Sequence, residues 1–151
     1  MTPKREAGFS LIELLIVVGL VAVLAGITVP AVAASMTRYS LISTSQQVVS
    51  TIRSARVQAV ARNRTLRVRF NHPVDGQYQV LDSADAEVGE AQLLPDGADF
   101  GDISGDVEFN ASGRATHVGG GAAPVTIVVS NGDEAQDRTI TISASGRVEL
   151  P

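Results

Sequence analysis

The first candidate for chemistry is a lone carboxylate, Glu13, at the start of a long apolar run. Phe9 stands four residues before it and is preceded by Gly8. From Leu14 to Thr37 the chain has 24 consecutive residues without a charged side chain. A carboxylate at the head of such a run costs about 3 kcal/mol if it enters a membrane. Glu13 is therefore a functional candidate, and it needs a positively charged partner.

The other reactive side chains form no recognisable catalytic or metal site. The chain of 151 residues has no cysteine, which excludes thiol catalysis, disulfide bonds and cysteine zinc sites. His72 and His117 stand alone, without the spacing of metal ligands. An acidic loop could hold calcium through oxygen ligands, but it lacks the spacing of an EF-hand, and a solvated loop is the preferred interpretation. The aspartates of this loop are Asp96, Asp99, Asp102 and Asp106. The sequence predicts no enzyme, no metal and no cofactor.

The apolar run is long enough to cross a bilayer core of about 30 Å. Lys4 and Arg5 precede it, which predicts a cytoplasmic leader by the positive-inside rule. A cleaved secretion signal is an alternative, because the small residues from Ala31 to Ala34 resemble a cleavage site. The run is longer than the usual signal core of about 7 to 15 residues. This length favours an anchor that stays in the protein.

The segment Gly8-Phe9-Ser10-Leu11-Ile12-Glu13 and the apolar residues up to Val18 resemble the processing site of type IV pilins and pseudopilins. The resemblance implies a leader, residues 1–8, that a membrane peptidase removes after Gly8. It also implies N-methylation of the new amino terminus at Phe9. The amine of Phe9 and the carboxylate of Glu13 could then neutralise each other between neighbouring subunits, which would set their register.

Pro30 interrupts the predicted assembly helix, residues 9–37. A proline removes a backbone donor and crowds the preceding turn, so we expect a kink or a locally unwound stretch between Gly26 and Pro30. In pilin-like proteins a proline in this position accompanies local unwinding during assembly. The resemblance therefore implies a role for Pro30 in assembly.

The rest of the chain predicts an amphipathic stalk helix, residues 38–64, followed by a β head, residues 65–151. Apolar residues recur at helical spacing from Leu41 to Ala59, and the pattern changes to alternation at Leu66. The predicted fold class is α+β, with a long N-terminal transmembrane and stalk helix packed on an antiparallel sheet head. The predicted strands are Leu66 to Phe70, Tyr78 to Leu81, Val88 to Leu93, Val107 to Phe109, Val125 to Val129, Thr139 to Ser143 and Arg147 to Leu150.

Two glycine-arginine turns indicate one particular group within this family. The helix end from Ser54 to Asn63, together with Gly113-Arg114 and Gly146-Arg147, resembles the GspH/FimT group of minor pilins and pseudopilins. Members of this group serve type II secretion pseudopili or type IV pili, and some FimT-type members bind DNA during natural transformation. In those DNA binders the basic residues lie near the last glycine-arginine turn.

Charge is distributed unevenly along the chain. No acidic residue occurs between Leu14 and Val74, whereas 14 acidic residues and only three arginines follow. This charge asymmetry indicates one of three partners. The basic stalk could contact the acidic head of a neighbouring subunit, or the protein could bind a membrane surface or a nucleic acid. The alternative interpretation is that the stalk arginines only solvate one helix face.

These observations predict a structural subunit that helps to initiate or cap a type II secretion pseudopilus or a type IV pilus. Its partners would be other pilins or pseudopilins, the prepilin peptidase and methyltransferase, and the membrane. The expected location is the inner membrane, with a single span and a periplasmic head, before incorporation into the filament. The alternative is a FimT-like DNA-binding minor pilin. Its candidate residues are Arg147, Arg138 and Arg114, although Glu149 and the acidic head oppose phosphate binding.

Overall fold

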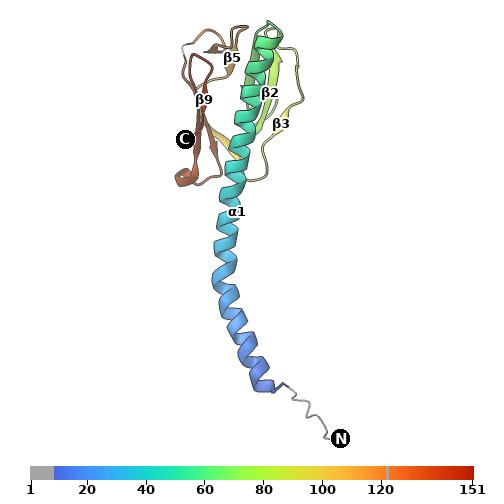
Figure 1. The fold of residues 1–151 in the computed structure, drawn as a ribbon, viewed down its shortest axis with the longest axis vertical. Coiled ribbons are helices and arrows are strands. Elements are labelled where there is room, and N and C mark those ends of the chain that lie inside the picture. Colours follow the sequence, from blue (N-terminus) through green and yellow to red (C-terminus); the bar gives the residue numbers. More distant parts are fainter. Residues whose placement is uncertain (1–8, 122) are drawn as a thin grey trace, which may run out of the picture. The chain divides into compact units, whose positions relative to one another are not determined.

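The computed structural model describes residues 9–121 and 123–151 (Figure 1). The chain divides into two compact units, Met1–Thr37 and Arg38–Pro151. One helix, α1 (Leu11–Ala61), contributes its first part to one unit and its second part to the other. Every strand belongs to the second unit, which we call the head domain.

The first part of α1 is continuous helix. The backbone nitrogen of Leu14 donates to the carbonyl oxygen of Ser10 at 3.2 Å, which places Ser10 just before the first turn. The backbone is also helical from Gly26 through Pro30, so the expected unwound stretch is absent from the single chain. A proline removes only one helical hydrogen bond, and here the flanking turns remain helical on both sides.

The end of α1 differs from the predicted boundary at residue 64 because a capping motif stops the helix at Ala61. Asn63 has a φ of +48°, in the left-handed region that asparagine tolerates better than most residues. The nitrogen of Arg64 donates to the Ala59 oxygen at 3.0 Å, and that of Asn63 donates to the Val60 oxygen at 3.2 Å. This pair of bonds is a Schellman motif, which satisfies carbonyl groups at a helix end.

The head domain contains two antiparallel sheets. The first has the strand order β3-β2-β1-β5-β6, and the second has the order β4-β7-β8-β9. The strands of the first sheet are β1 (Leu66–Phe70), β2 (Gln77–Asp82), β3 (Gln92–Leu93), β5 (Val107–Phe109) and β6 (Ala115–His117). The second sheet contains β4 (Asp99–Ile103), β7 (Val125–Ser130), β8 (Arg138–Ile142) and β9 (Val148–Glu149), with a short 3-10 helix at Glu134–Gln136.

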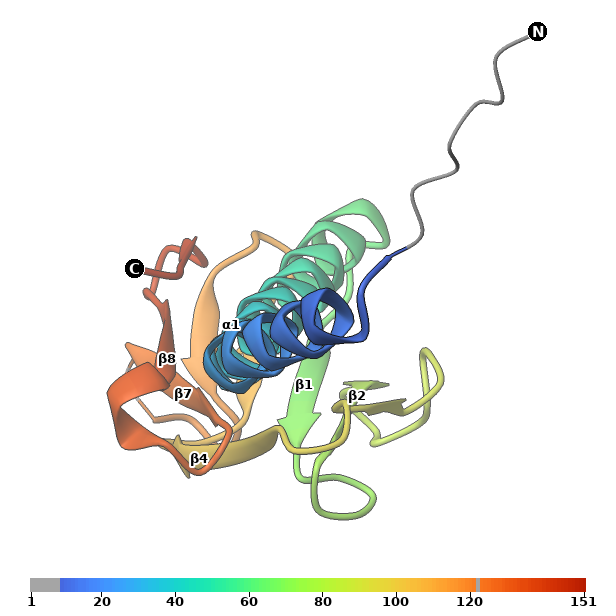
Figure 2. The same ribbon diagram turned by 90° about the horizontal axis from the view of Figure 1, so that it is seen from below.

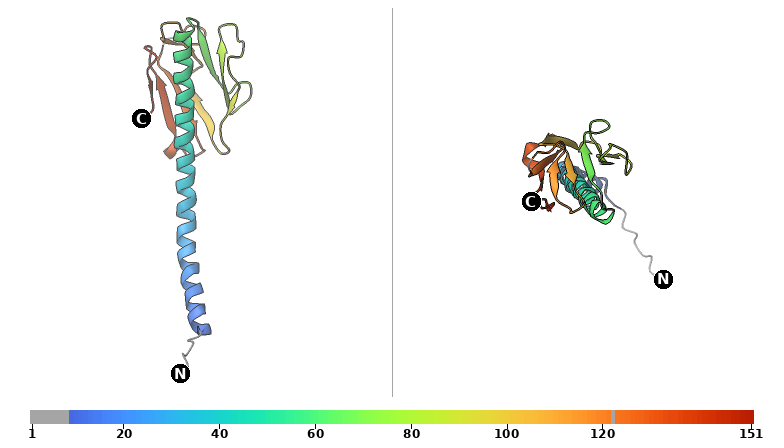
Figure 3. Two further views of the ribbon diagram at one scale, coloured as in Figure 1. Left: turned by 45° about the vertical axis from the view of Figure 1, so that its right-hand side comes forward. Right: turned by 90° about the horizontal axis from the view of Figure 1, so that it is seen from above.

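The second part of α1 packs against both sheets (Figures 2 and 3). Val48, Ile52 and Ala59 are fully buried there, at the helical spacing of an amphipathic face. The sheets also contact each other through aromatic rings, because Phe100 of β4 lies edge-on against Phe70 and Tyr78, with ring centroids 5.4 and 5.9 Å apart. The predicted α+β fold, a long helix on antiparallel sheets, is confirmed.

The strand predictions are partly right. The predicted strand Leu66 to Phe70 matches β1, and its alternate residues are buried. The predicted strand from Val88 to Leu93 is wrong over most of its length, since within it only the two residues of β3 form a strand paired with β2. Just before it, Glu87 forms an isolated bridge to Leu81 of β2. Two strands were missed, β4 and β6. The acidic loop from Asp96 to Asp106 is therefore interrupted by a paired strand.

Candidate functional site

The amino-terminal candidates lie at the start of α1. Phe9 precedes the helix and is 81% exposed, and Glu13 is the acidic residue of the first turn. Both side chains face solvent in the single chain. Among the ion pairs of residues 9–121 and 123–151, none involves Glu13. Gly8, the predicted cleavage site, lies outside the described residues, as does the side chain of Pro30.

The helix that follows Glu13 has the length and composition of a membrane span. The window Leu11–Thr28 has a mean hydropathy of 2.7, and none of it is buried inside the protein. It is therefore not a core helix of this chain, although a secretion signal has the same length and composition. Its apolar side chains are fully available to lipid or to other helices.

The two glycine-arginine turns lie against each other at one end of the head domain. Gly113 and Gly146 have φ values of +74° and +78°, which favour glycine, and both are buried. A Cβ atom on Gly146 would overlap the carbonyl oxygen of Gly113. The close approach of the two turns thus requires a glycine at position 146.

Arg56 of α1 ties both turns to the helix. Its Nε donates to the carbonyl oxygen of Gly113 at 2.9 Å, and its Nη2 donates to that of Ser145 at 3.3 Å. Val60, which follows Arg56 by four residues, packs close to Gly113. Charge-assisted bonds of this kind stabilise a structure by about 1.5–3 kcal/mol each. Arg56 therefore fixes the position of both turns relative to the helix.

The structure brings together two of the three predicted DNA-binding arginines. Arg114 and Arg147 each follow one of the contacting glycines, so their backbones lie at the same end of the head domain. Arg138 begins β8, at the opposite end of the strand from the turn that precedes Arg147, and its Nη1 donates to the Pro151 oxygen at 3.1 Å. Arg147 forms an ion pair with Glu149, with 2.9 Å between Nε and Oε1. This pair neutralises one of the two adjacent arginines.

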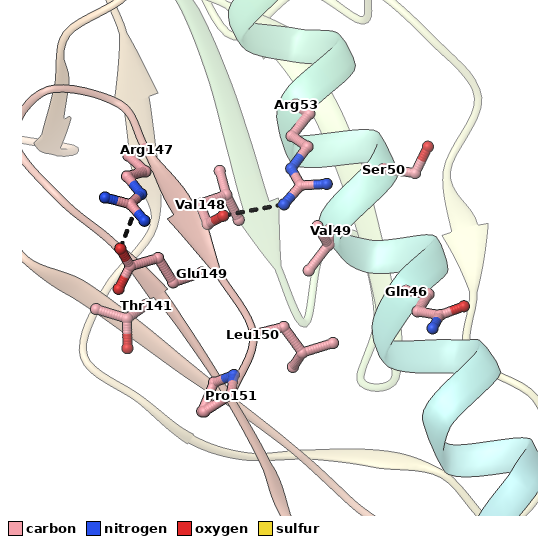
Figure 4. A pocket seen from close by; sticks show the side chains of 10 residues that line it. All are labelled: Gln46, Val49, Ser50, Arg53, Thr141, Arg147, Val148, Glu149, Leu150 and Pro151. Carbon is pink, nitrogen blue, oxygen red and sulfur yellow. Dashed lines mark hydrogen bonds and ion pairs between the residues drawn. The ribbon is translucent and has the colours of Figure 1, made fainter.

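A groove of about 920 Å³ separates α1 from the last residues of the head domain (Figure 4). Arg53 crosses it, because its Nη2 donates to the Val148 carbonyl oxygen of β9 at 3.0 Å. Its lining is mixed in polarity and has no side-chain set suited to catalysis. The groove is lined by Gln46, Val49, Ser50, Arg53, Thr141, Arg147, Val148, Glu149, Leu150 and Pro151.

The histidines and the aspartates of the acidic loop do not converge. The His117 ring lies beside Gly105 and Gly121. Asp106 accepts from the backbone nitrogen of Phe70 at 2.9 Å and pairs with Arg69 at 3.2 Å. Within the part of the chain that the structure describes, no three histidine, aspartate or glutamate side chains come close enough to hold a metal ion.

Sequence reasoning missed the structural work of Arg53 and Arg56. The sequence suggests that the stalk arginines either act as charged partners of other molecules or are solvated side chains, and neither interpretation reveals their targets within the chain. Arg56 bonds to the carbonyl groups of Gly113 and Ser145, which lie 57 and 89 residues away in the sequence. Arg53 bonds to the carbonyl group of Val148, which lies 95 residues away. Since a carbonyl group carries no sequence signal, only the three-dimensional fold shows these contacts.

Comparisons with known proteins agree with this architecture. Residues 44–146 match the family described as type II transport protein GspH, and residues 3–29 match the prokaryotic N-terminal methylation motif. No curated protein matches the chain.

Two solved structures share the fold. The type IV minor pilin FimU of Pseudomonas aeruginosa has 17% identity and a TM-score of 0.62, over 76% of this chain and 90% of that one. The minor pseudopilin EpsH from the type 2 secretion system of Vibrio cholerae has 14% identity and a TM-score of 0.54, over 73% of this chain and 94% of that one. With its apolar amino-terminal helix, its two sheets and its match over residues 44–146, the chain belongs to the GspH family of pilin-like proteins.

Proposed function

We propose that this protein is a membrane-anchored minor subunit that helps to initiate or cap a type II secretion pseudopilus or a type IV pilus. It acts as a structural component and not as a catalyst. After cleavage behind Gly8 and methylation of Phe9, α1 would hold the protein in the inner membrane with the head domain in the periplasm. The protein would then assemble with other pilin-type subunits into the filament.

The observation that carries this proposal is the unpaired Glu13 at the head of an unburied apolar helix. Apolar side chains from Leu11 to Thr28 have no cover within the chain, so they need lipid or neighbouring helices. Glu13 has no ion-pair partner among the described residues. The free amine that cleavage would create at Phe9 of a neighbouring subunit would provide the missing charge, and a buried pair of this kind can fix register.

The test is a Glu13→Gln variant expressed in the native cell. We expect normal processing, with a mature mass that begins at Phe9, but poor incorporation into filaments, because the neutral amide cannot pair with the amine. Glu13→Asp retains the charge and serves as the matched control. Incorporation of Glu13→Gln at the parent level would contradict the pairing, and a mature mass beginning near Ala33 would show a cleaved secretion signal instead.

The machine that uses the protein can be identified by its neighbours. Cross-linking in native membranes, followed by mass spectrometry of the purified products, should recover other pilin-type subunits. Secretion pseudopilins among them would assign the protein to type II secretion. Minor pilins and the retraction apparatus would assign it to a type IV pilus. Recovery of neither class would contradict the proposed function.

DNA capture is the alternative function, and one observation favours it. The contact between the two turns places Arg114 and Arg147 at the same end of the head domain, where two cations could meet adjacent phosphates. The Arg147–Glu149 pair opposes this function. If DNA is bound, affinity for duplex DNA should fall with salt and drop on the double change Arg114→Ala and Arg147→Ala. An unchanged affinity in that variant, or no binding at low salt, would exclude this alternative.

A further inference from the structure

The two edge strands of the second sheet are protected in different ways. At one edge, β4 carries the exposed Asp99 and Asp102, and its register shifts between Phe100 and Ile103. Charged residues and irregular pairing keep other strands from adding to an edge. At the other edge, β9 pairs regularly with β8 and faces the groove, where the side chain of Arg53 bonds to it from α1 (Figure 4). The β9 edge is therefore closed by a side chain that can turn aside.

The backbone groups of Val148 in β9 face this groove. In an antiparallel pair, residues that bond to the partner strand alternate with residues whose N–H and C=O groups point away from it. The nitrogen of Ser143 donates to the Arg147 oxygen at 3.0 Å, so the next residue, Val148, points its backbone groups away from β8. The bond of 3.0 Å from Arg53 Nη2 to the Val148 oxygen agrees with this direction.

The groove also has the lining that an added strand needs. Leu150, two residues after Val148, packs against the same core, so its backbone groups face the groove as well. The apolar side chains of Val49 and Leu150 line the groove together with the polar Gln46 and Ser50. A strand that pairs with β9 would lie about 4.8 Å from it. It would therefore lie within this groove, whose volume is about 920 Å³.

The charges of the groove favour an acidic strand. Arg147 is paired with Glu149 at 2.9 Å, whereas Arg53 has no carboxylate within ion-pair distance among the residues that the structure describes. No acidic residue follows Glu13 in α1, so the helix wall of the groove has no negative charge. A carboxylate on an incoming strand could accept hydrogen bonds from Arg53, which would release the Val148 oxygen for a backbone N–H.

We propose that β9 accepts an extended, acidic segment of a different pilin-type subunit as an added strand, while Arg53 turns from the Val148 oxygen to a carboxylate of that segment. Strand addition gives affinity through backbone hydrogen bonds and specificity through side-chain contacts. Before the partner arrives, Arg53 keeps the edge closed, which protects the subunit from unspecific strand pairing.

The charge and the geometry favour a partner with a different sequence. Pairing of β9 with β9 of a second copy would bring two Arg53 side chains together, and like charges repel each other. An edge takes a single strand, so the contact joins this subunit to one other and suits a component that initiates or caps a filament. The inference rests on the proposed function and deepens it, because it identifies the surface that receives a partner subunit.

A photo-activated cross-linker in the full membrane-anchored chain, expressed in the native cell, tests the contact. The cross-linking amino acid replaces Gln46, which lines the groove and lies two helical turns before Arg53 on the same face. The matched control replaces Gln47, which is also exposed but does not line the groove. We expect position 46 to give a product whose cross-linked peptide belongs to another pilin-type subunit and contains an aspartate or a glutamate.

Two results would overturn the proposal at this stage. One is an equal yield of that product from positions 46 and 47. The other is a product from position 46 that contains only a nucleic acid or only a second copy of this chain.

Two changes at Leu150 test whether the contact is made by strand pairing. Leu150→Pro removes the N–H that would bond to the added strand, and proline is tolerated where an edge strand faces outward. Leu150→Ala shortens the side chain but keeps the N–H. The yield from position 46 should be about fivefold lower in Leu150→Pro than in Leu150→Ala, the effect of one backbone hydrogen bond. Equal yields in the two variants would refute strand addition.

Charge reversal tests the role of Arg53 without a change in the backbone, and it decides the matter if Leu150→Pro fails to fold. Arg53→Glu should lower the yield from position 46 about threefold, the effect of one exposed ion pair. Exchange of the acidic residue in the cross-linked segment for arginine should then restore the yield. Arg62→Glu is the matched control, because Arg62 is exposed but does not line the groove. Equal effects of the two reversals, or no restoration, would overturn the proposal.

The same cross-linker at Leu15 separates failure of this contact from failure of the proposed function. Leu15 is exposed in the apolar part of α1. Products with other pilin-type subunits from position 15 but not from position 46 would refute the strand addition alone. Absence of such products from both positions would refute the strand addition and would also contradict assembly with pilin-type subunits.

Discussion

The two parts of α1 differ in where their apolar side chains find cover. In the head domain, Leu41, Val48 and Ile52 are at most 2% exposed, because both sheets pack on one face of the helix. In the other unit, Leu15 is 65% exposed, and most of its apolar neighbours are similarly open. The second part of α1 has an internal partner, while the first part has none within the chain.

This difference teaches that hydrophobicity has two separate uses in a single helix. Burial of apolar area stabilises the isolated chain only when the cover belongs to the same chain. The second part of α1 therefore contributes to the folding of the head domain. The first part contributes little to that folding, and in the proposed function it anchors the protein in the membrane. Substitutions in the two parts should accordingly affect different measurements.

The largest expected effect is that of Ile52→Ala. Ile52 is fully buried against the sheets, and truncation leaves a cavity, so the free energy of unfolding should fall by about 4 kcal/mol. Leu15→Ala removes a similar side chain from the exposed part and should change the same quantity by less than about 0.5 kcal/mol. Denaturant unfolding of the detergent-solubilised full chain measures both. Similar losses in the two variants would show that the comparison between the two parts is wrong.

A smaller effect is expected within the head domain for Gly146→Ala. The left-handed φ and the overlap with the Gly113 oxygen should together lower the free energy of unfolding by about 3 kcal/mol. Gly132→Ala is the matched control, because Gly132 has a φ of +85° but open space around it, so it should lose only about 1 kcal/mol. Equal losses would mean that the contact between the two turns does not contribute.

The smallest effect concerns Asp82 and acid. The backbone nitrogens of Ala86 and Ala84 donate to its Oδ1 at 3.0 and 2.8 Å, and these bonds lower the pKa of the carboxyl group below its usual value of 3.8. A lowered folded-state pKa gives stability that is present above the unfolded pKa and lost as the pH falls through the folded pKa. Asp82→Asn should remove this acid-sensitive part. Unfolding curves between pH 5 and about pH 2 should therefore be flatter for the variant than for the parent; parallel curves would contradict this role.

Local patterns predicted the elements that bury one face. The alternation from Leu66 to Phe70 identified β1, and the helical spacing from Leu41 to Ala59 identified the buried face of α1. Strand β4 was not predicted, because its acidic sequence buries only Phe100 and its pairing register with β7 shifts between Phe100 and Ile103. A strand of this kind has no alternation that a sequence can show.

Long-range pairing explains the remaining differences. Val88 was assigned to a strand, but it only follows an isolated bridge between Glu87 and Leu81, through which its nitrogen donates to the Val80 oxygen of β2. The chain forms a strand again only at β3. The division into two sheets depends on the pairing of β1 with β5 and of β4 with β7, which no local pattern encodes. For the candidate site, the sequence located Glu13 and the two turns, whereas Arg56 required the fold.

The bonds from α1 to the last turn have a consequence for the order of synthesis. Arg56 and Arg53 leave the ribosome early, but their acceptors at Ser145 and Val148 follow 89 and 95 residues later. A nascent chain can form its helix and the first hairpin while these acceptors are still in the exit tunnel. The head domain can close only after Val148 emerges, so a chain halted upstream of it exposes the groove beside Arg53 and presents an unfinished domain to proteases.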